Sequence, residues 1–284
     1  MPTADQTQSD EQAVLTSPLH FRSDLLNGQV VLVTGAGSGI GQFAAVQLAR
    51  LGADVAICGR RLEPLLATKR LVESVGRKCL VQDMSIRDSD AVSALIGEVW
   101  QHFGRLDVLI NNAGGQFAQS AMEFSVKGWN AVIDTNLNGP WYLMQAVGRR
   151  WKEANLPGAI VNIVTVANNG QPGIAHTCAA RAGTIHLSKT LAVEWAPFHI
   201  RVNCVAPGII ETQGLDVYPE DARQEFQHAN PMKRLGQMRD IADACCYLAG
   251  PTGAFITGEV LSVAGGGQLW GDTWAIPRPD YFKY

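Results

Sequence analysis

The hydroxyl of Thr177 and the guanidinium of Arg181 lie four residues apart in the stretch His176-Thr-Cys-Ala-Ala-Arg181. On a helix, residues four apart share a face, so both groups can point at one ligand. Arginine stays charged at any working pH, and both side chains donate hydrogen bonds. The pair therefore predicts a site that stabilises negative charge on an oxygen. His176 is the nearest titratable group, and two alternatives stay open for it: a proton relay, or local packing at a helix start.

A glycine-rich loop predicts a dinucleotide-binding site. The apolar run 30–34 leads directly into Gly35-Ala-Gly-Ser-Gly-Ile-Gly41, which is followed by an apolar helical stretch. Glycines let the backbone turn tightly and approach a pyrophosphate, which then lies on the positive N-terminus of the helix. The residues expected to contact the cofactor here are Gly35, Ser38, Gly39, Ile40 and Gly41.

Two arginines, Arg60 and Arg61, follow the second apolar run, where no carboxylate is present. An acidic residue at this place would bind the ribose 2′-hydroxyl of NAD, whereas arginine suits the 2′-phosphate of NADP. Helix starts also disfavour cations, which favours a functional explanation over a solvated pair. The sequence therefore predicts NADP(H) in preference to NAD(H), with Asp83 and Met84 beside the adenine ring.

Two further segments are expected around the cofactor. Asn112, Ala113 and Gly114 end the fourth apolar run, where small residues leave room for the ligand. The sixth run leads into a Pro-Gly turn, which we expect to bring backbone groups and a hydroxyl near the nicotinamide carboxamide. The residues expected there are Pro207, Gly208, Ile210 and Thr212.

These residues sit in a regular alternation of short apolar runs and longer amphipathic stretches. The runs cover residues 30–34, 54–58, 78–82, 108–111, 159–164, 201–206 and 260–263, and the helical stretches 41–51, 62–75, 89–103, 128–154, 178–196 and 239–249. This alternation predicts an α/β fold: a single doubly wound Rossmann domain, with a seven-stranded parallel sheet and helices on both faces.

The domain organisation follows from the same pattern. Residues 1–18 are expected to be a disordered lead, and 19–284 a single dinucleotide-binding and catalytic domain. Residues 211–238 form a polar, lid-like insertion with two prolines, and 268–284 form an aromatic C-terminal tail.

Composition narrows the function. The 284 residues are 46% hydrophobic and 17% charged, with a formal net charge of -3, so nothing suggests a nucleic-acid or membrane partner. The six cysteines have no CxxC pair or zinc spacing, so no metal site is expected. The N-terminal residues lack the apolar region of a secretory signal, and we expect a cytoplasmic protein that acts on a small molecule.

Four motifs in order resemble the short-chain dehydrogenase/reductase family: TGAGSGIG, Asn111-Asn-Ala-Gly114, Asn136 and PGIIET. The resemblance implies a seven-stranded single domain, a homotetramer, and an Asn–Ser–Tyr–Lys catalytic set. Only Asn136 matches that set. Thr165 alone offers a hydroxyl at the serine position, while the tyrosine is replaced by Thr177 and the lysine by Arg181. Arg181 is still expected to bind the cofactor, by hydrogen bonds to the nicotinamide ribose hydroxyls.

Gly115-Gln-Phe117 and the run from His176 to Gly183 resemble a narrower branch, the trans-2-enoyl-CoA reductases and, more loosely, the 2,4-dienoyl-CoA reductases. Members of that branch also lack tyrosine at this position. The resemblance implies an acyl-CoA substrate.

The missing phenol redirects the chemistry. Carbonyl reduction builds an alkoxide and gains typically about 10²–10⁴-fold from a positioned acid. Reduction of a double bond conjugated to a thioester sends hydride to the β-carbon and charge to the thioester oxygen, where hydroxyl and arginine donors suffice. The proton then goes to the α-carbon, from water or from another residue such as Tyr218.

Three hypotheses remain open from the sequence. The first is an NADPH-dependent reductase of 2-enoyl or dienoyl thioesters, in which Thr177, Thr165 and Arg181 stabilise the enolate. The second is an alcohol/carbonyl oxidoreductase, acting on a 3-oxoacyl thioester or a terpenoid or long-chain alcohol, with His176 or Tyr218 as proton donor. The third is a dinucleotide-binding sensor or subunit without catalysis.

Overall fold

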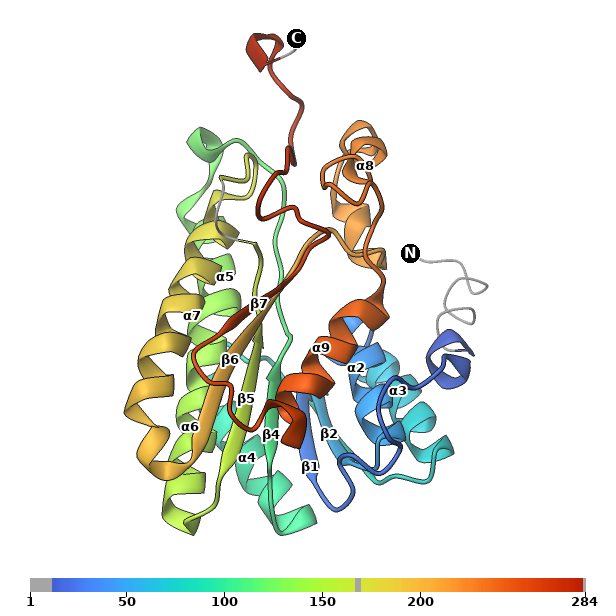
Figure 1. Ribbon diagram of the computed structural model, residues 1–284. Coiled ribbons are helices and arrows are strands. Elements are labelled where there is room, and N and C mark those ends of the chain that lie inside the picture. Colours follow the sequence, from blue (N-terminus) through green and yellow to red (C-terminus); the bar gives the residue numbers. More distant parts are fainter. Residues whose placement is uncertain (1–11, 167–169, 283–284) are drawn as a thin grey trace.

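The computed structural model describes residues 12–166 and 170–282, in which seven parallel strands form one sheet in the order β3-β2-β1-β4-β5-β6-β7 (Figure 1). The strands are β1 (Val30–Thr34), β2 (Asp54–Gly59), β3 (Cys79–Asp83), β4 (Val108–Asn111), β5 (Gly158–Ile163), β6 (Ile200–Pro207) and β7 (Val260–Val263). Strand order reverses between β1 and β4, which places ligands at the carboxyl ends of these strands. The predicted fold class is confirmed.

Helices cover both faces of the sheet (Figure 1). One face carries α2 (Gly39–Arg50), α3 (Leu62–Ser74) and α9 (Met238–Ala249). The other carries α4 (Ser89–Phe103), α5 (Val126–Ile133), α6 (Gly139–Ala154) and α7 (Ala175–Glu194). Short 3-10 segments are η1 (Ala121–Glu123), η3 (Ala196–Phe198), η4 (Gln213–Val217), η5 (Pro251–Gly253) and η6 (Asp280–Phe282). In the described residues no helix is both long and apolar enough to cross a membrane.

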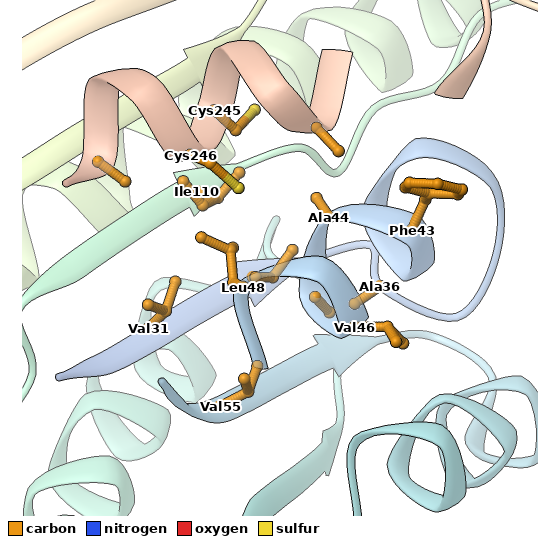
Figure 2. Close-up of a cluster of buried hydrophobic side chains, with 14 of the residues drawn as sticks. Val31, Ala36, Phe43, Ala44, Val46, Leu48, Val55, Ile110, Cys245 and Cys246 are labelled. Carbon is orange, nitrogen blue, oxygen red and sulfur yellow. The ribbon is translucent and has the colours of Figure 1, made fainter. Parts of the chain in front are cut away.

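The core on the α2 side explains why the strand sequences are apolar at successive positions and do not alternate with polar residues. All five residues of β1 are buried, because helices cover both faces of a parallel sheet. Figure 2 shows Leu48 of α2 between β1 and α9, close to the Cys245 and Cys246 side chains. Burial raises the pKa of the Cys245 thiol to about 12, so it packs as a neutral apolar group.

The N-terminal lead differs from the expectation of disorder over residues 1–18. Residues 1–11 lie outside the described part, but 12–16 are helical. Val14 is buried in the α2-side core. Arg50 donates to the backbone oxygens of Val14 (2.7 Å) and Ser17 (2.8 Å). One buried apolar side chain and these two bonds hold a segment that composition alone describes as polar.

The helix expected over residues 128–154 is divided by a π-helical segment, η2 (Asp134–Asn138), between α5 and α6. Such π-bulges occur often at functional sites. The insertion between β6 and α9 contains η4 and α8 (Glu220–Phe226). Both the insertion and the C-terminal tail lie at one end of the sheet (Figure 1). The tail pairs with the loop before α7, since the Ala275 N–H donates to the Pro172 oxygen at 3.1 Å.

Packing on the α6 side makes a stability prediction at Gly158, the first residue of β5. A Cβ atom there would overlap the ring of Trp151, which is fully buried and whose Nε1 donates to the Leu106 oxygen. Gly158→Ala should therefore lower the free energy of unfolding by about 1–3 kcal/mol, measured by urea denaturation. The control is Gly97→Ala in α4, where nothing lies within 4 Å of the added atom. It should stabilise by about 0.5–1 kcal/mol; equal effects at the two sites would contradict the packing argument.

Candidate active site

A groove runs along the carboxyl ends of the strands and consists of two joined cavities. The main cavity has a volume of about 630 Å³ and the second about 400 Å³. Both are lined by residues of the glycine-rich loop and of the loop after β4. The shared lining residues are Ser38, Arg60, Asn112, Gly114, Gly115 and Gln116.

The glycine-rich loop packs too closely for side chains. Gly35 has a φ of 66°, and a Cβ atom on it would lie 2.8 Å from Cα of Ala113. A Cβ atom on Gly41 would lie 2.5 Å from the Gly35 oxygen. Ser38 makes no side-chain cap bond to α2, and the first turn of α2 holds no acidic residue. The helix N-terminus, with Gly39 and Ile40, therefore faces the groove with free N–H groups that suit a pyrophosphate.

Thr34 and Asn112 link the ends of β1 and β4 below this loop. The Thr34 hydroxyl accepts from the backbone N–H groups of Asn112 (3.1 Å) and Ala113 (3.0 Å). The Asn112 side chain donates to the oxygens of Thr34 (2.9 Å) and Gly35 (3.2 Å). These bonds satisfy backbone groups where the two strands separate, and they fix the floor of the groove at its centre.

The second cavity holds the residues expected around the adenosine. Arg60, Arg61 and Met84 line it, whereas Asp83 is exposed and lies outside its lining. Within the described residues neither arginine is paired with a carboxylate. Both are therefore free to meet a negatively charged group on a ligand.

The main cavity holds the residues expected around the nicotinamide, which are Pro207, Gly208, Ile210 and Thr212. Thr165, expected at the catalytic serine position, also lines it. The Thr212 hydroxyl accepts from the Gly214 N–H at 3.2 Å and so caps η4. A Cβ atom on Gly208 would lie 2.9 Å from Cα of Ala264, which explains a glycine there.

Arg181 is a buried cation without an anion. It lines the main cavity beside Thr177, from the same face of α7, and is only 7% exposed. In the described residues no carboxylate and no hydrogen-bond acceptor partners its guanidinium. Burial lowers the pKa of Arg181 to about 10. Its Nη2 occupies the place that a Cβ atom on Gly114 would need, so the guanidinium packs directly against the loop after β4.

Asn136 belongs to the π-helical segment, and both its side chain and its backbone oxygen form hydrogen bonds. Its Oδ1 accepts from the Gly115 N–H (3.1 Å), and its Nδ2 donates to the Gly115 oxygen (2.8 Å). Its own backbone oxygen accepts from the Thr184 hydroxyl at 3.0 Å. Asn136 therefore holds the loop after β4 in position, and the second hydrogen of its Nδ2 is not used by these bonds.

His176 lies outside the lining of both cavities, in contrast to Thr177 and Arg181. Its ring stacks on Phe124 with centroids 4.4 Å apart and meets the edge of Phe117 at 4.6 Å. Its Nδ1 accepts from the Thr177 N–H at 2.7 Å, so Nε2 carries the proton, and Nε2 is buried with no partner in the described residues. This geometry fits local packing better than a proton relay.

Sequence reasoning missed several cavity residues. Gln116 lines the main cavity and donates a hydrogen bond to the hydroxyl of Tyr218, which the sequence offers as an alternative proton donor. Asn230 and Gln268 carry buried side-chain oxygens without a partner in the described part of the chain. The tail contributes Thr273 and Ala275. Of these, only the Gly115-Gln-Phe117 run gave a signal in the sequence.

Comparisons with known proteins identify the family to which this chain belongs. A family model described as enoyl-(acyl carrier protein) reductase matches residues 35–268. A probable 2,4-dienoyl-CoA reductase ((2E)-enoyl-CoA-producing) of Bacillus subtilis is 36% identical over 256 residues, 88% of this chain and 98% of the relative. The chain belongs to the short-chain dehydrogenase/reductase family.

Solved structures of short-chain dehydrogenases have the same fold. One from Bacillus anthracis is 39% identical, with a TM-score of 0.82 over 86% of this chain and 98% of that one. Carveol dehydrogenase from Mycobacterium avium, in complex with NAD, is 27% identical, with a TM-score of 0.82 over 87% and 99%. As a member of this family the chain is a nicotinamide dinucleotide-dependent oxidoreductase, which leaves the non-catalytic hypothesis without support.

The environment of His176 predicts a pH dependence of stability. Burial holds the pKa of His176 below its ordinary value of 6.5, against smaller opposing effects of the Ile174 and Phe117 backbone. The unfolded chain takes up a proton as the pH falls through about 6.5, whereas folded His176 stays neutral until a lower pH. Stability should therefore fall below pH 6.5, by at most about 1.4 kcal/mol per pH unit for this one proton.

His176→Asn keeps an acceptor for the Thr177 N–H and removes the titration, so the stability loss between pH 6.5 and 5 should become shallower. His186→Asn, at an exposed position of the same helix, is the matched control. Urea denaturation at each pH gives the comparison. An unchanged slope in His176→Asn, or the same change in both variants, would contradict a neutral buried His176.

Proposed function

We propose that the protein is an NADPH-dependent reductase of the C2–C3 double bond of enoyl thioesters, of the 2-enoyl-CoA or dienoyl-CoA kind. The observation that carries this proposal is the buried, unpaired guanidinium of Arg181 in the main cavity. An uncompensated buried charge is costly, so the site is ready for an anion that forms only during the reaction. A thioester enolate is such an anion.

The residues of the site would have different roles in this reaction. A nicotinamide dinucleotide in the groove supplies a hydride. Arg181 and the Thr177 hydroxyl, with Thr165 beside them, donate hydrogen bonds toward the thioester oxygen, where charge develops. Asn136 orients the loop after β4 through Gly115.

The substrate's carrier arm finds acceptors in the same cavity. Asn230 Oδ1 and Gln268 Oε1 are buried without a partner in the described residues, and an unsatisfied buried acceptor costs about 1–3 kcal/mol. The phosphopantetheine arm of CoA and of acyl carriers carries amide N–H groups that would satisfy them. This supports a thioester on such an arm over a free small alcohol.

The preference for NADP(H) rests on Arg60 and Arg61. Both line the adenosine cavity and are unpaired within the described chain, and the end of β2 lacks a carboxylate. Unpaired arginines here favour a 2′-phosphate, whereas an NAD site would use an acidic residue. We also propose a homotetramer, as usual in this family; exposed apolar residues such as Val193 on α7 support an interface.

A second candidate function is an alcohol/carbonyl oxidoreductase, on a 3-oxoacyl thioester or a terpenoid alcohol. Tyr218 favours it, because a phenol does reach the main cavity although α7 supplies none. The similarity to carveol dehydrogenase points the same way. Substrate preference decides between the two.

A small substrate panel tests the proposed function. NADPH oxidation, followed by absorbance, should be fast with crotonyl-CoA or a long 2-enoyl-CoA. It should be at least about 10²-fold slower with acetoacetyl-CoA, since a ketone alkoxide needs a proton at its oxygen. A terpenoid alcohol with NADP⁺ should give no turnover. Reaction with the ketone or the alcohol alone would overturn enoyl reduction in favour of the second candidate.

Arg60→Asp tests the cofactor preference. Loss of the charged donor and introduction of a carboxylate should lower the ratio of kcat/KM for NADPH to that for NADH by more than about tenfold, because a hydrogen bond to a charged group contributes about 1.5–3 kcal/mol. Arg70→Asp makes the same charge change at an exposed position of α3 outside both cavities. Its ratio should match that of the wild type. A ratio unmoved by Arg60→Asp would refute this role.

A further inference from the structure

Tyr218 brings a phenol into the main cavity from the insertion between β6 and α9. It directly follows η4 in the insertion between β6 and α9, and it lines the cavity together with Thr177 and Arg181. No other tyrosine is among the residues that line this cavity. The phenol that α7 lacks is therefore present, but it comes from the insertion.

The hydroxyl of Tyr218 has a free proton. Its oxygen accepts a hydrogen bond from Nε2 of Gln116, and in the described residues no acceptor takes its O–H. Burial raises the pKa of Tyr218, against a smaller opposite effect of Gln116, so the phenol stays protonated at neutral pH. After loss of the proton, the same Gln116 N–H would stabilise the phenolate oxygen.

Both partners are held in place by packing. The ring of Tyr218 meets Phe226 edge-on, with centroids 5.3 Å apart, and Phe226 is itself buried. Gln116 lies between two fixed neighbours: Gly115 is bonded twice to Asn136, and Phe117 packs on His176. The position of the phenol in the cavity is thus set by groups on both of its sides.

Tyr218 also borders a second opening. Tyr218 and Ala275 line both the main cavity and a neighbouring space of about 560 Å³, whose other walls include Gln119, Pro219 and Pro277. Several of these wall residues are exposed, so the space is open to water. One side of the tyrosine faces the main cavity and the other has access to solvent protons.

We propose that Tyr218 is the general acid that protonates the α-carbon of the enolate, with Gln116 as its positioning residue; this rests on the proposed enoyl reduction. A nicotinamide bound in the groove would supply the hydride for the new C–H bond at the β-carbon, and the π electrons of the C2–C3 bond would move to the thioester oxygen. The enolate then forms a C–H bond at its α-carbon as the O–H bond of Tyr218 breaks. Water from the second opening returns a proton to the phenolate.

The test is Tyr218→Phe, assayed with NADPH and a 2-enoyl-CoA. The variant keeps the packing on Phe226 and should retain the wild-type Tm and Kd for NADPH, while kcat falls about 10²-fold. In D₂O the wild type should place deuterium on one face of C2, and the variant should give a mixture of both C2 epimers, because water protonates the enolate without direction. NMR of the product reads this out.

The matched control is Tyr247→Phe, which removes the same oxygen from α9, outside the cavities. It should leave kcat and the C2 stereochemistry unchanged. Gln116→Leu should also slow the reaction, and the double variant Gln116→Leu/Tyr218→Phe should be no slower than Tyr218→Phe alone, since Gln116 acts through the phenol. Additive losses would contradict that coupling.

The outcomes separate the two proposals. If the wild type reduces enoyl thioesters while Tyr218→Phe keeps kcat within about twofold, or keeps a single C2 epimer, Tyr218 is not the acid and the proposed function stands. If none of the enoyl thioesters supports NADPH oxidation by the wild type, the proposed function fails, and the assignment of Tyr218 fails with it.

Discussion

The site depends on burying the guanidinium of Arg181 with no anion beside it. A buried unpaired charge is expensive, and its lowered pKa of about 10 reflects that cost. The fold must therefore supply the stability from elsewhere: apolar packing on both faces of the sheet, and close contacts such as Gly114 against the guanidinium. What the protein gains is a positive charge that would require no reorganisation if negative charge develops on a bound ligand.

The loop after β4 connects that charge to the rest of the site. Its start is joined to β1 by Thr34 and Asn112, its middle is held by Asn136, and its end packs on His176. β1, the π-helical segment and the first turn of α7 contribute these contacts. A shift in any of them would therefore move Gln116 together with the backbone around the nicotinamide position. The same loop thereby sets both the cofactor groove and the substrate side.

Most of the fold could be predicted because its signals are local. The seven apolar runs match the strands within about two residues at each end, and the glycines mark places where a side chain would collide with Ala113 or with the Gly35 oxygen. The misses involve contacts between distant segments. The π-helical interruption at Asp134–Asn138 and the burial of Val14 leave no trace in periodicity. The pairing of Gln116 with Tyr218, 102 residues apart, exists only once the insertion has folded over the cavity.

The arrangement also bears on why a dehydrogenase of this family tolerates threonine at position 177. In carbonyl reduction the developing charge and the proton arrive at one oxygen, so a single phenol beside a cation serves both needs. In conjugate reduction the charge collects on the thioester oxygen, while the proton is needed at the α-carbon, two bonds away. Here the cation comes from α7 and the phenol from the insertion between β6 and α9. A cation and a phenol on different elements fit the proposed conjugate reduction, which would not need an acid at the oxygen beside Thr177.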